Sequence, residues 1–312
     1  MAAVNVQDRR IEQYLSNFAV SYKQGERVAD FIAPPFKVKK SSDKYLEWTK
    51  NNFRILDNKI KGREEGKEID LKVDEGSYSC EEYETDAYIL DRDIRNSEGV
   101  GTLRLKEDTI ARMMDSHLDS REKRVADIAF SSSIVTQTAD KSAAWATVAS
   151  GTPVADIITA AVTINDAAGV RPNAIVMGFN VAMTLIKTDE WKDYFKYDNS
   201  MGNKQAIWNA VEGLRNLGLQ PMISGVRGLS TYEGTASDPT WETLISDSVL
   251  IFYRENVPTT RSMTFMSSPY TMMNKVESWR IPGQRGTKYS VYEEVDELLI
   301  NASCAYLYTN VI

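Results

Sequence analysis

Histidine and cysteine, on which most metal sites and many catalytic sites depend, are almost absent from this chain of 312 residues. His117 is the one histidine, so no metal site can rest on two histidines, and a Ser-His-Asp triad would have to form around that position. The two cysteines, Cys80 and Cys304, lie far apart and form no CxxC motif. We therefore expect two reduced thiols that pack as small apolar side chains, and no disulfide framework.

The chain also lacks long apolar runs and an excess of positive charge. No run approaches the roughly 20 apolar residues that span a bilayer, and the first residues lack the apolar core of a signal peptide. The formal net charge is −7, which argues against a surface devoted mainly to nucleic acid, because such surfaces are normally basic. With 42% hydrophobic and 26% charged residues, the composition is that of a globular protein. We expect a soluble protein made in a reducing cytoplasm, with no membrane association.

The sequence motifs of common enzyme classes are missing or incomplete. Residues 62–68 resemble a phosphate loop, but the glycine spacing is one residue short and Glu68 stands where Ser or Thr should hold magnesium. Residues 99–104 fail the dinucleotide fingerprint because Arg104 replaces the third glycine. Acidic neighbours such as Glu81 and Glu82 point to opposite faces of a strand and form no catalytic pair. The sequence therefore predicts no catalytic site, no cofactor and no metal.

The first third of the chain combines a narrow amphipathic helix with extended segments. Two prolines make residues 33–38 extended. Strands predicted over 44–54 and 69–73 flank a charged turn at 58–68, which together make a long hairpin. Such an arm carries too few apolar residues to be stable alone, so we expect it to lie on another surface. Helical spacing predicts a helix over residues 7–24, with an apolar stripe formed by Ile11, Tyr14, Leu15, Phe18 and Tyr22.

A long helix is predicted over residues 105–130. At 1.5 Å per residue it is about 37 Å long and can act as a spine. His117 lies beside its apolar stripe, so we expect a structural role for it. The apolar stripe contains Ile110, Met113, Met114, Leu118, Val125 and Ile128. Charged residues are assigned to the other face, namely Arg112, Asp115, Asp119, Glu122 and Lys123.

The segment from about 151 to 255 reads as an α/β domain, preceded by a polar loop that Trp145 anchors. Thr152 is the expected N-cap of a helix that starts at Pro153 and ends at Gly169. A short buried strand at 174–177 and a helix at 181–187 follow. Further predicted elements are a helix at 206–217 capped by Gly218, a strand at 219–224 and a surface loop at 225–247.

The last part of the chain is rich in predicted strands. They lie at 249–253, 263–265, 276–281, 288–292 and 305–308, and an acidic turn at 293–297 separates the last two. The predicted fold class is therefore α+β.

With these elements in order, the chain resembles the major capsid proteins of tailed bacteriophages, a fold shared with encapsulins and the floor of the herpesvirus capsid. Residues 31–38 and 42–48 are similar to the family's entry into its extended loop, and residues 81–88 to the return strand. Residues 172–178 with Val181 and Leu185 are similar to the passage that opens the family's axial domain. Residues 289–311 are similar to its closing strands.

The resemblance implies a domain division and a function. It implies an N-terminal arm (1–36), an extended β-hairpin loop (37–85), a peripheral domain with a spine helix (86–150 and 256–312) and an axial α/β domain (151–255). Copies of the chain would self-assemble, without catalysis, into hexamers and pentamers of an icosahedral head that encloses double-stranded DNA without sequence-specific binding. The expected location is the virion, after assembly in the host cytoplasm. Expected partners are a separate scaffolding protein, a portal and a decoration protein.

The resemblance also implies which residues meet neighbouring subunits. At the tip of the extended loop these are Lys59, Lys61, Arg63, Glu64, Glu65, Lys67 and Glu68. In the N-terminal arm they are Ile11, Tyr14, Phe18 and Tyr22. Some relatives cross-link their shells through a lysine in this loop, and Lys59, Lys61 and Lys67 lie in the matching region.

Two alternatives stay open on the sequence alone. One is an encapsulin-type compartment shell, which has the same fold but encloses an enzyme. The other is a hydrolase or transferase whose active site lies in residues 151–255, against which the lone histidine and the missing nucleophile motif count.

Overall fold

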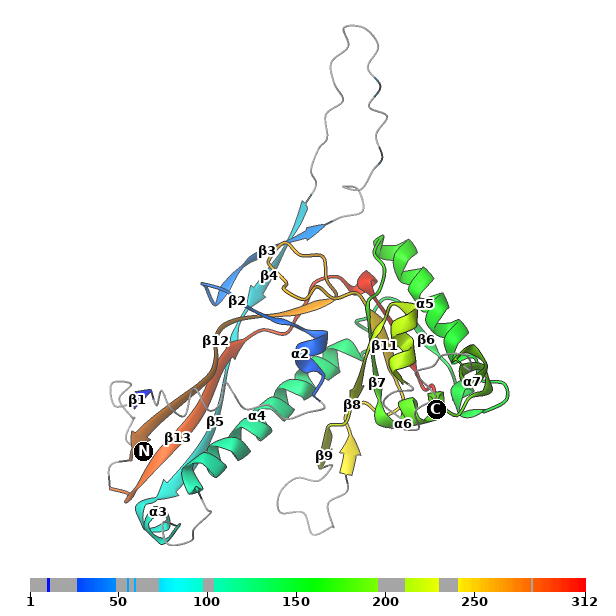
Figure 1. Ribbon diagram of the computed structural model, residues 1–312. Coiled ribbons are helices and arrows are strands. Elements are labelled where there is room, and N and C mark those ends of the chain that lie inside the picture. The colour runs from blue at the N-terminus through cyan, green and yellow to red at the C-terminus, as the bar shows by residue number, and fades with distance from the viewer. Residues whose placement is uncertain are drawn as a thin grey trace.

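Two sheets, one long and open and one short and covered on both faces, organise the computed structural model of the chain (Figure 1). The structure describes residues 10–11, 27–48, 55, 59, 73–97, 104–195, 211–229, 241–281 and 283–312. In the part of the chain so described, no helix combines the length and the apolarity that a bilayer crossing requires.

The long sheet lies beside the helix α4 (Leu105–Ala129), which confirms the predicted spine. Its strands run in the order β1 (Arg10–Ile11), β12 (Met266–Arg280), β13 (Gly286–Val295) and β5 (Glu81–Leu90). Two short strands, β2 (Pro35–Lys37) and β14 (Leu298–Leu299), also pair with β12. The apolar stripe of α4 packs on this sheet, where its buried members Ile110, Met113 and Met114 meet Ile89, Val276, Tyr289 and Val291. A short helix, α3 (Asp91–Ser97), follows β5 at the far end of the sheet.

The short sheet forms the core of the second part of the molecule. Its strands are β6 (Thr138–Asp140), β15 (Ala305–Thr309), β11 (Val249–Phe252), β7 (Ala174–Gly178) and β8 (Gln220–Ser224), in that spatial order. Every residue of the central strands β7 and β11 is buried, because helices cover both faces. Alternate residues of these strands point to opposite faces and divide the interior into two apolar clusters.

Each face of the short sheet has its own covering helices. On one face lie α5 (Pro153–Ala168), α6 (Phe179–Leu185) and α7 (Asp189–Phe195), with Trp191 and Trp145 fully buried. On the other lie α2 (Ala29–Ile32) and the C-terminal end of α4. The spine helix therefore contributes to both parts of the molecule.

Two strands of the short sheet come from outside residues 151–255. β6 pairs with β15 in parallel, and β15 pairs with β11, so the chain's last strand lies within the α/β part and not with the long sheet. Asp156 holds these pieces on α5. Its carboxylate accepts hydrogen bonds from Trp145 Nε1 (2.8 Å) and Lys141 Nζ (2.7 Å), and its carbonyl accepts one from the Tyr308 hydroxyl (2.8 Å). Sequence spacing alone cannot reveal this return of the chain.

The described base of the predicted hairpin consists of β3 (Ser42–Trp48) and β4 (Val73–Ser79), which pair antiparallel and project away from both sheets (Figure 1). A Cβ atom at Gly76 would lie 2.2 Å from the Tyr45 ring, which packs across the strand pair, so a larger residue here would displace that ring. Cys80 N donates to Ser41 O (2.7 Å), and β5 begins at the next residue. The hairpin thus continues directly into the long sheet.

Several local predictions differ from the structure. Arg10 and Ile11, predicted within a helix, form strand β1 on β12, so a tertiary pairing overrides helical spacing there. The predicted loop at 225–247 contains a small hairpin, β9 (Arg227–Leu229) and β10 (Trp241–Thr243). The predicted helix before Gly218 is, in its described part, the 3-10 helix η5 (Glu212–Leu217), although Gly218 caps it with φ 80° as expected. The predicted strand at 263–265 begins only at Met266.

One further prediction was wrong, and at a helix N-cap that was predicted correctly another residue accepts the capping hydrogen bonds. Glu293 was placed in an acidic turn, yet it lies in β13 and is fully buried. Thr152 occupies the N-cap of α5, but its side chain makes no capping hydrogen bond. The carboxylate of Glu190, from α7, accepts instead from Val154 N (2.8 Å) and Ala155 N (3.3 Å). A partner distant in sequence therefore satisfies the free N–H groups of the first helical turn.

The capping by Glu190 gives a direct comparison between two substitutions. Glu190→Ala should lower the free energy of unfolding by about 1–2 kcal/mol, because it leaves two N–H groups without their charged acceptor. Thr152→Ala should change it by no more than about 0.5 kcal/mol. Urea unfolding of the purified subunit measures both values. A larger loss in Thr152→Ala than in Glu190→Ala would contradict the assignment.

Candidate functional site

A row of buried charged residues on α4 joins the N-terminal segment to the spine. Glu122 is 1% exposed, and its carboxylate accepts hydrogen bonds from Val28 N (3.0 Å) and Ala29 N (2.7 Å). Arg121, equally buried, pairs with Asp30 at 2.9 Å. These contacts cap α2 from the side of α4 and fix where the chain enters the body.

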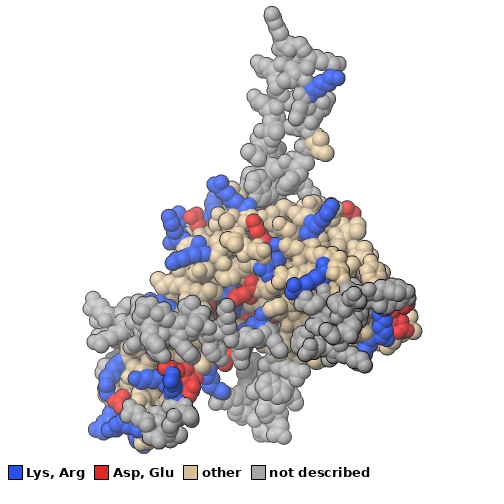
Figure 2. Space-filling view, in the orientation of Figure 1, with Lys and Arg blue, Asp and Glu red and all other residues tan. Residues whose placement is uncertain are grey.

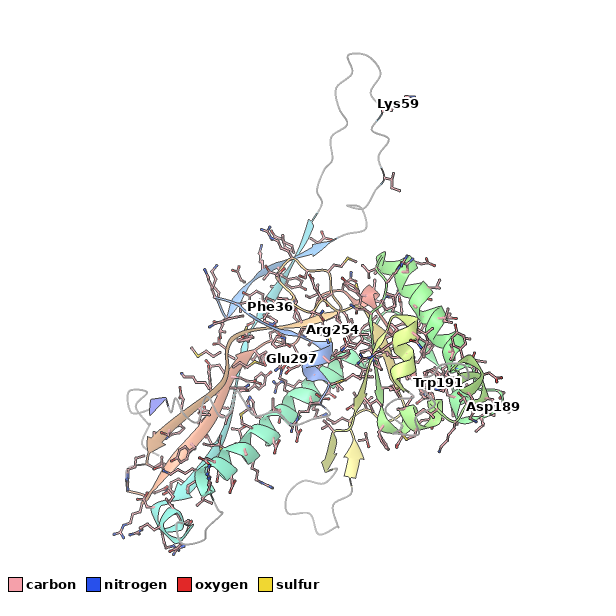
Figure 3. All side chains as sticks on the ribbon, in the orientation of Figure 1. Phe36, Lys59, Asp189, Trp191, Arg254 and Glu297 are labelled. Atoms are coloured by element: carbon pink, nitrogen blue, oxygen red, sulfur yellow. The ribbon has the colours of Figure 1, made fainter. Side chains whose placement is uncertain are left out.

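A second ion pair cluster joins α4 to β13. His117 Nε2 lies 3.0 Å from Glu293 Oε1, and both side chains are almost completely buried. Arg124 pairs with Glu293 (3.0 Å) and with Glu297 (2.9 Å), and its guanidinium lies 3.6 Å from the centre of the Tyr83 ring on β5. Figure 3 shows Glu297 beside the spine helix, between the two sheets. Helix and sheet are therefore held by charge as well as by apolar packing.

Burial and charge act in opposite directions on the pKa values of these groups. Burial raises the pKa of Glu122, and the N–H groups of Val28 and Ala29 only partly oppose it. Burial also raises the pKa of Glu293, but His117, Arg121 and Arg124 outweigh it and hold the net pKa below its usual value. Glu293 is thus a carboxylate that the fold stabilises in its ionised form.

Neither cluster has the arrangement of a catalytic site. Within the residues that the structure describes, no three His, Cys, Asp or Glu side chains group to hold a metal ion. Burial raises the pKa of Cys80 to about 11 and that of Cys304 to about 12, so both thiols stay protonated and unreactive at neutral pH. Both are free thiols, as the sequence predicted.

One cavity in the α/β part also offers no chemistry. It measures about 650 Å³ and lies between α5 and the segments around Arg171 and Gly218. Among its described lining residues there is no Ser, Cys, His, Asp or Glu, so neither a nucleophile nor an acid–base pair faces it. The enzyme alternative for residues 151–255 gains no support from this geometry.

The structure places few of the sequence-predicted contact residues. Lys59 lies beyond the described strands of the hairpin and away from both sheets (Figure 3), and its side chain is exposed. Ile11 lies in β1 on the long sheet. The other predicted contacts lie outside the described residues: Tyr14, Phe18, Tyr22, Lys61, Arg63, Glu64, Glu65, Lys67 and Glu68.

The prediction that Glu122 lies on the outer face of α4 was wrong, and Arg121 and Arg124 were assigned to neither face. The spacing did carry a signal. Glu122 follows Leu118 by four residues and precedes Val125 by three, so it lies on the apolar stripe. A charged residue at such a position predicts a buried partner.

Solved structures of other proteins identify the fold of this chain. No protein-family model and no curated protein matches the chain. A phage-related protein from Bordetella bronchiseptica RB50 has a TM-score of 0.74 at 18% identity, with 97% of this chain and 98% of that chain covered. The virus-like particle from Pyrococcus furiosus (94% and 95% covered) and the capsid of cyanophage P-SCSP1u (89% and 86% covered) each have a TM-score of 0.53 at 10% identity. The chain has the tailed-phage major capsid fold.

The parts of the capsid fold are recognisable in this chain. The α+β class is confirmed, with α4 as the spine helix and β3–β4 as the base of the extended loop. Arg254 lies where the two sheets approach each other, with its guanidinium 4.3 Å from the centre of the Phe31 ring (Figure 3). The two hydrogen bonds between the Asn173 side chain and the Arg254 backbone fix this crossing segment.

Loss of the Glu122 carboxylate should weaken the capsid fold more than loss of an exposed one. Glu122→Ala leaves the buried N–H groups of Val28 and Ala29 without acceptors, and we expect a loss of about 3 kcal/mol in the free energy of unfolding. Asp127→Ala removes only the exposed pair with Lys123 and should cost about 0.5 kcal/mol or less. Urea unfolding compares the two. Losses equal within error would show that Glu122 does not hold the N-terminal segment.

The ionised state of Glu293 predicts a pH dependence with a definite sign. Because the pKa is lowered by folding, Glu293 stabilises the subunit above its unfolded pKa, near 4.5, and this stabilisation is lost as the pH falls further and the group protonates. Glu293→Gln should therefore be less stable than wild type at pH 7 and lose less stability below about pH 4.5. The exposed Asp127→Asn variant should keep the wild-type slope. A wild-type slope in Glu293→Gln would contradict the assignment.

Proposed function

We propose that this chain is a major capsid protein of a tailed bacteriophage or prophage. Copies of it would assemble into hexamers and pentamers of an icosahedral head shell that encloses double-stranded DNA in the virion. The observation that carries the proposal is the fold, which matches a phage-related protein over nearly the whole of both chains and also matches capsid and virus-like-particle structures.

The shape of the subunit supports this function. The β3–β4 hairpin projects from the body, and Lys44 pairs with Glu75 across its base, so its own residues hold it at the point of departure (Figure 1). A projecting arm has little reason to exist in a monomer, whereas in a shell it lies on a neighbour. An acidic subunit also suits a wall that must not bind packaged DNA tightly.

The domain division is proposed with one amendment. The arm (1–36) and extended loop (37–85) stay as the sequence suggests. The axial domain would include β6 and β15 in addition to residues 151–255, because both strands belong to its sheet. The peripheral domain would then consist of the spine helix and those parts of the long sheet that lie outside the arm and the extended loop. A separate scaffolding protein, a portal and assembly in the host cytoplasm belong to the same proposal.

A compartment shell around an enzyme is the less favoured alternative. Phage-related and capsid proteins recur among the similar structures, including the capsid of a GTA particle with a TM-score of 0.53. Particles purified from the native host decide between DNA and a protein cargo.

Deletion of residues 58–68 tests the role of the extended loop. The described base of the hairpin ends at Trp48 and resumes at Val73, so the deletion leaves the β3–β4 pairing intact. We expect a subunit with unchanged thermal unfolding that no longer forms shells by sedimentation velocity. Shells of wild-type size would remove the loop from the assembly contacts. A variant that fails to fold would show that the loop belongs to a core.

A further inference from the structure

The far end of the long sheet carries an unbalanced group of arginines. A cavity of about 830 Å³ lies where β5, α3, β12 and β13 end, and four arginines line it: Arg92, Arg95, Arg280 and Arg285. We call them the arginine cluster. Asp91 is the one acidic residue among the described lining residues. The cavity therefore carries a formal charge of +3, while the rest of this acidic chain carries −10.

Among the described residues, few acidic groups neutralise the arginine cluster. Asp91 pairs with Arg280, and Arg92 has only a long contact of 3.6 Å to Asp93. Within the described residues, neither Arg95 nor Arg285 takes part in an ion pair. The side chains of Arg92 and Arg280 are 75% and 68% exposed. Figure 2 shows Lys and Arg gathered at this end of the molecule, over α3. Guanidinium groups held together in this way favour a bound anion.

The opposite end of the same sheet has the opposite imbalance. Glu82 on β5 lies directly across from Glu294 on β13, and like charges in that position destabilise a strand pair. Glu81 precedes Glu82, and both are exposed. Asp296 comes directly after Val295, the last residue of the partner strand β13. We call Glu81, Glu82, Glu294 and Asp296 the acidic end. β5 spans ten residues between the two ends, or about 30 Å.

The negative charge of the acidic end helps to raise the pKa values of two neighbouring groups. Burial raises the pKa of Cys80 to about 11, and Asp296 and Glu294 add to this effect. Burial raises the pKa of Tyr292 to about 12, and Glu82 adds to it as the next largest cause. Within the described residues, no ion pair includes Glu82 or Glu294, while the arginine cluster at the other end of the sheet keeps a net positive charge, so the two ends are complementary in charge.

We propose that the arginine cluster of one subunit binds Glu82 and Glu294 of a neighbouring copy in a head-to-tail contact. The proposal rests on the proposed function, since it names two surfaces through which shell subunits meet. The occupant is a second copy and not nucleic acid, because the matching carboxylates lie directly opposite each other on the same sheet, and Glu82 is exposed. A head-to-tail contact is heterologous, and such contacts close into rings when the rotation between copies allows it.

Charge reversal on each side tests the contact. The variant Arg92→Glu/Arg95→Glu and the variant Glu82→Lys/Glu294→Lys should each lower the fraction of assembled protein by about tenfold or more, because each places like charges in the contact. A single chain with all four substitutions restores opposite charges and should recover most of the assembly. Lys106→Glu, an exposed lysine outside the cavity, controls for net charge and should assemble as wild type.

Sedimentation velocity and negative-stain microscopy measure assembly, and thermal unfolding of the unassembled subunit checks that each variant folds. If a reversal variant does not fold, the neutral Arg92→Gln/Arg95→Gln variant replaces it, with a smaller loss expected. Wild-type assembly of the arginine variants would overturn this contact and leave the proposed function standing. Loss without recovery in the fourfold variant would overturn the second copy as the occupant. Failure of the wild-type chain itself to assemble would instead remove the proposed function.

Discussion

The structure depends on one constraint, the attachment of separate pieces of chain to a single helix. α4 runs along the long sheet and reaches the short one, and its buried charges make each connection specific. Glu122 holds the segment that leads into the extended loop, and Arg124 with His117 holds the acidic strand β13. Apolar packing alone would allow these pieces to slide along the helix, whereas a buried carboxylate with two N–H partners fits one position.

This arrangement explains how a subunit with so little continuous core keeps a defined shape. The two sheets share no strand, but the chain passes between them at Arg254 and again before β15. The return of the last strand to the short sheet ties the end of the chain to α5 through Asp156. The hairpin and both ends of the long sheet stay outside these connections, and these are the parts that we propose to meet other subunits.

Much of this fold could be predicted from the sequence because its elements carry strong local signals. The helical spacing along the 25 residues of α4, the prolines at the start of β2 and the buried run of β7 each specify one conformation. The order of these elements was enough to suggest the capsid fold. The features that the sequence did not predict have non-local causes. The carboxylate that caps α5 comes from Glu190, and the strand at Arg10–Ile11 exists only through its pairing with β12. Helical spacing places Glu122 on the apolar stripe of α4, so its burial could have been predicted from the sequence.

The candidate contact surfaces were likewise only partly predictable from the sequence. A charged hairpin tip is visible in the sequence, but the arginine cluster joins residues from α3, β12 and the turn before β13, nearly 200 positions apart. Only the sheet brings them together.

The most direct test of the account is sedimentation velocity of the purified full-length chain, with electron microscopy of each fraction. We expect capsomer-sized and shell-sized particles, with closed shells or rings in the micrographs. A single species at the subunit mass of 35.1 kDa under all conditions, including with any scaffolding protein of the same phage, would contradict the proposed capsid function.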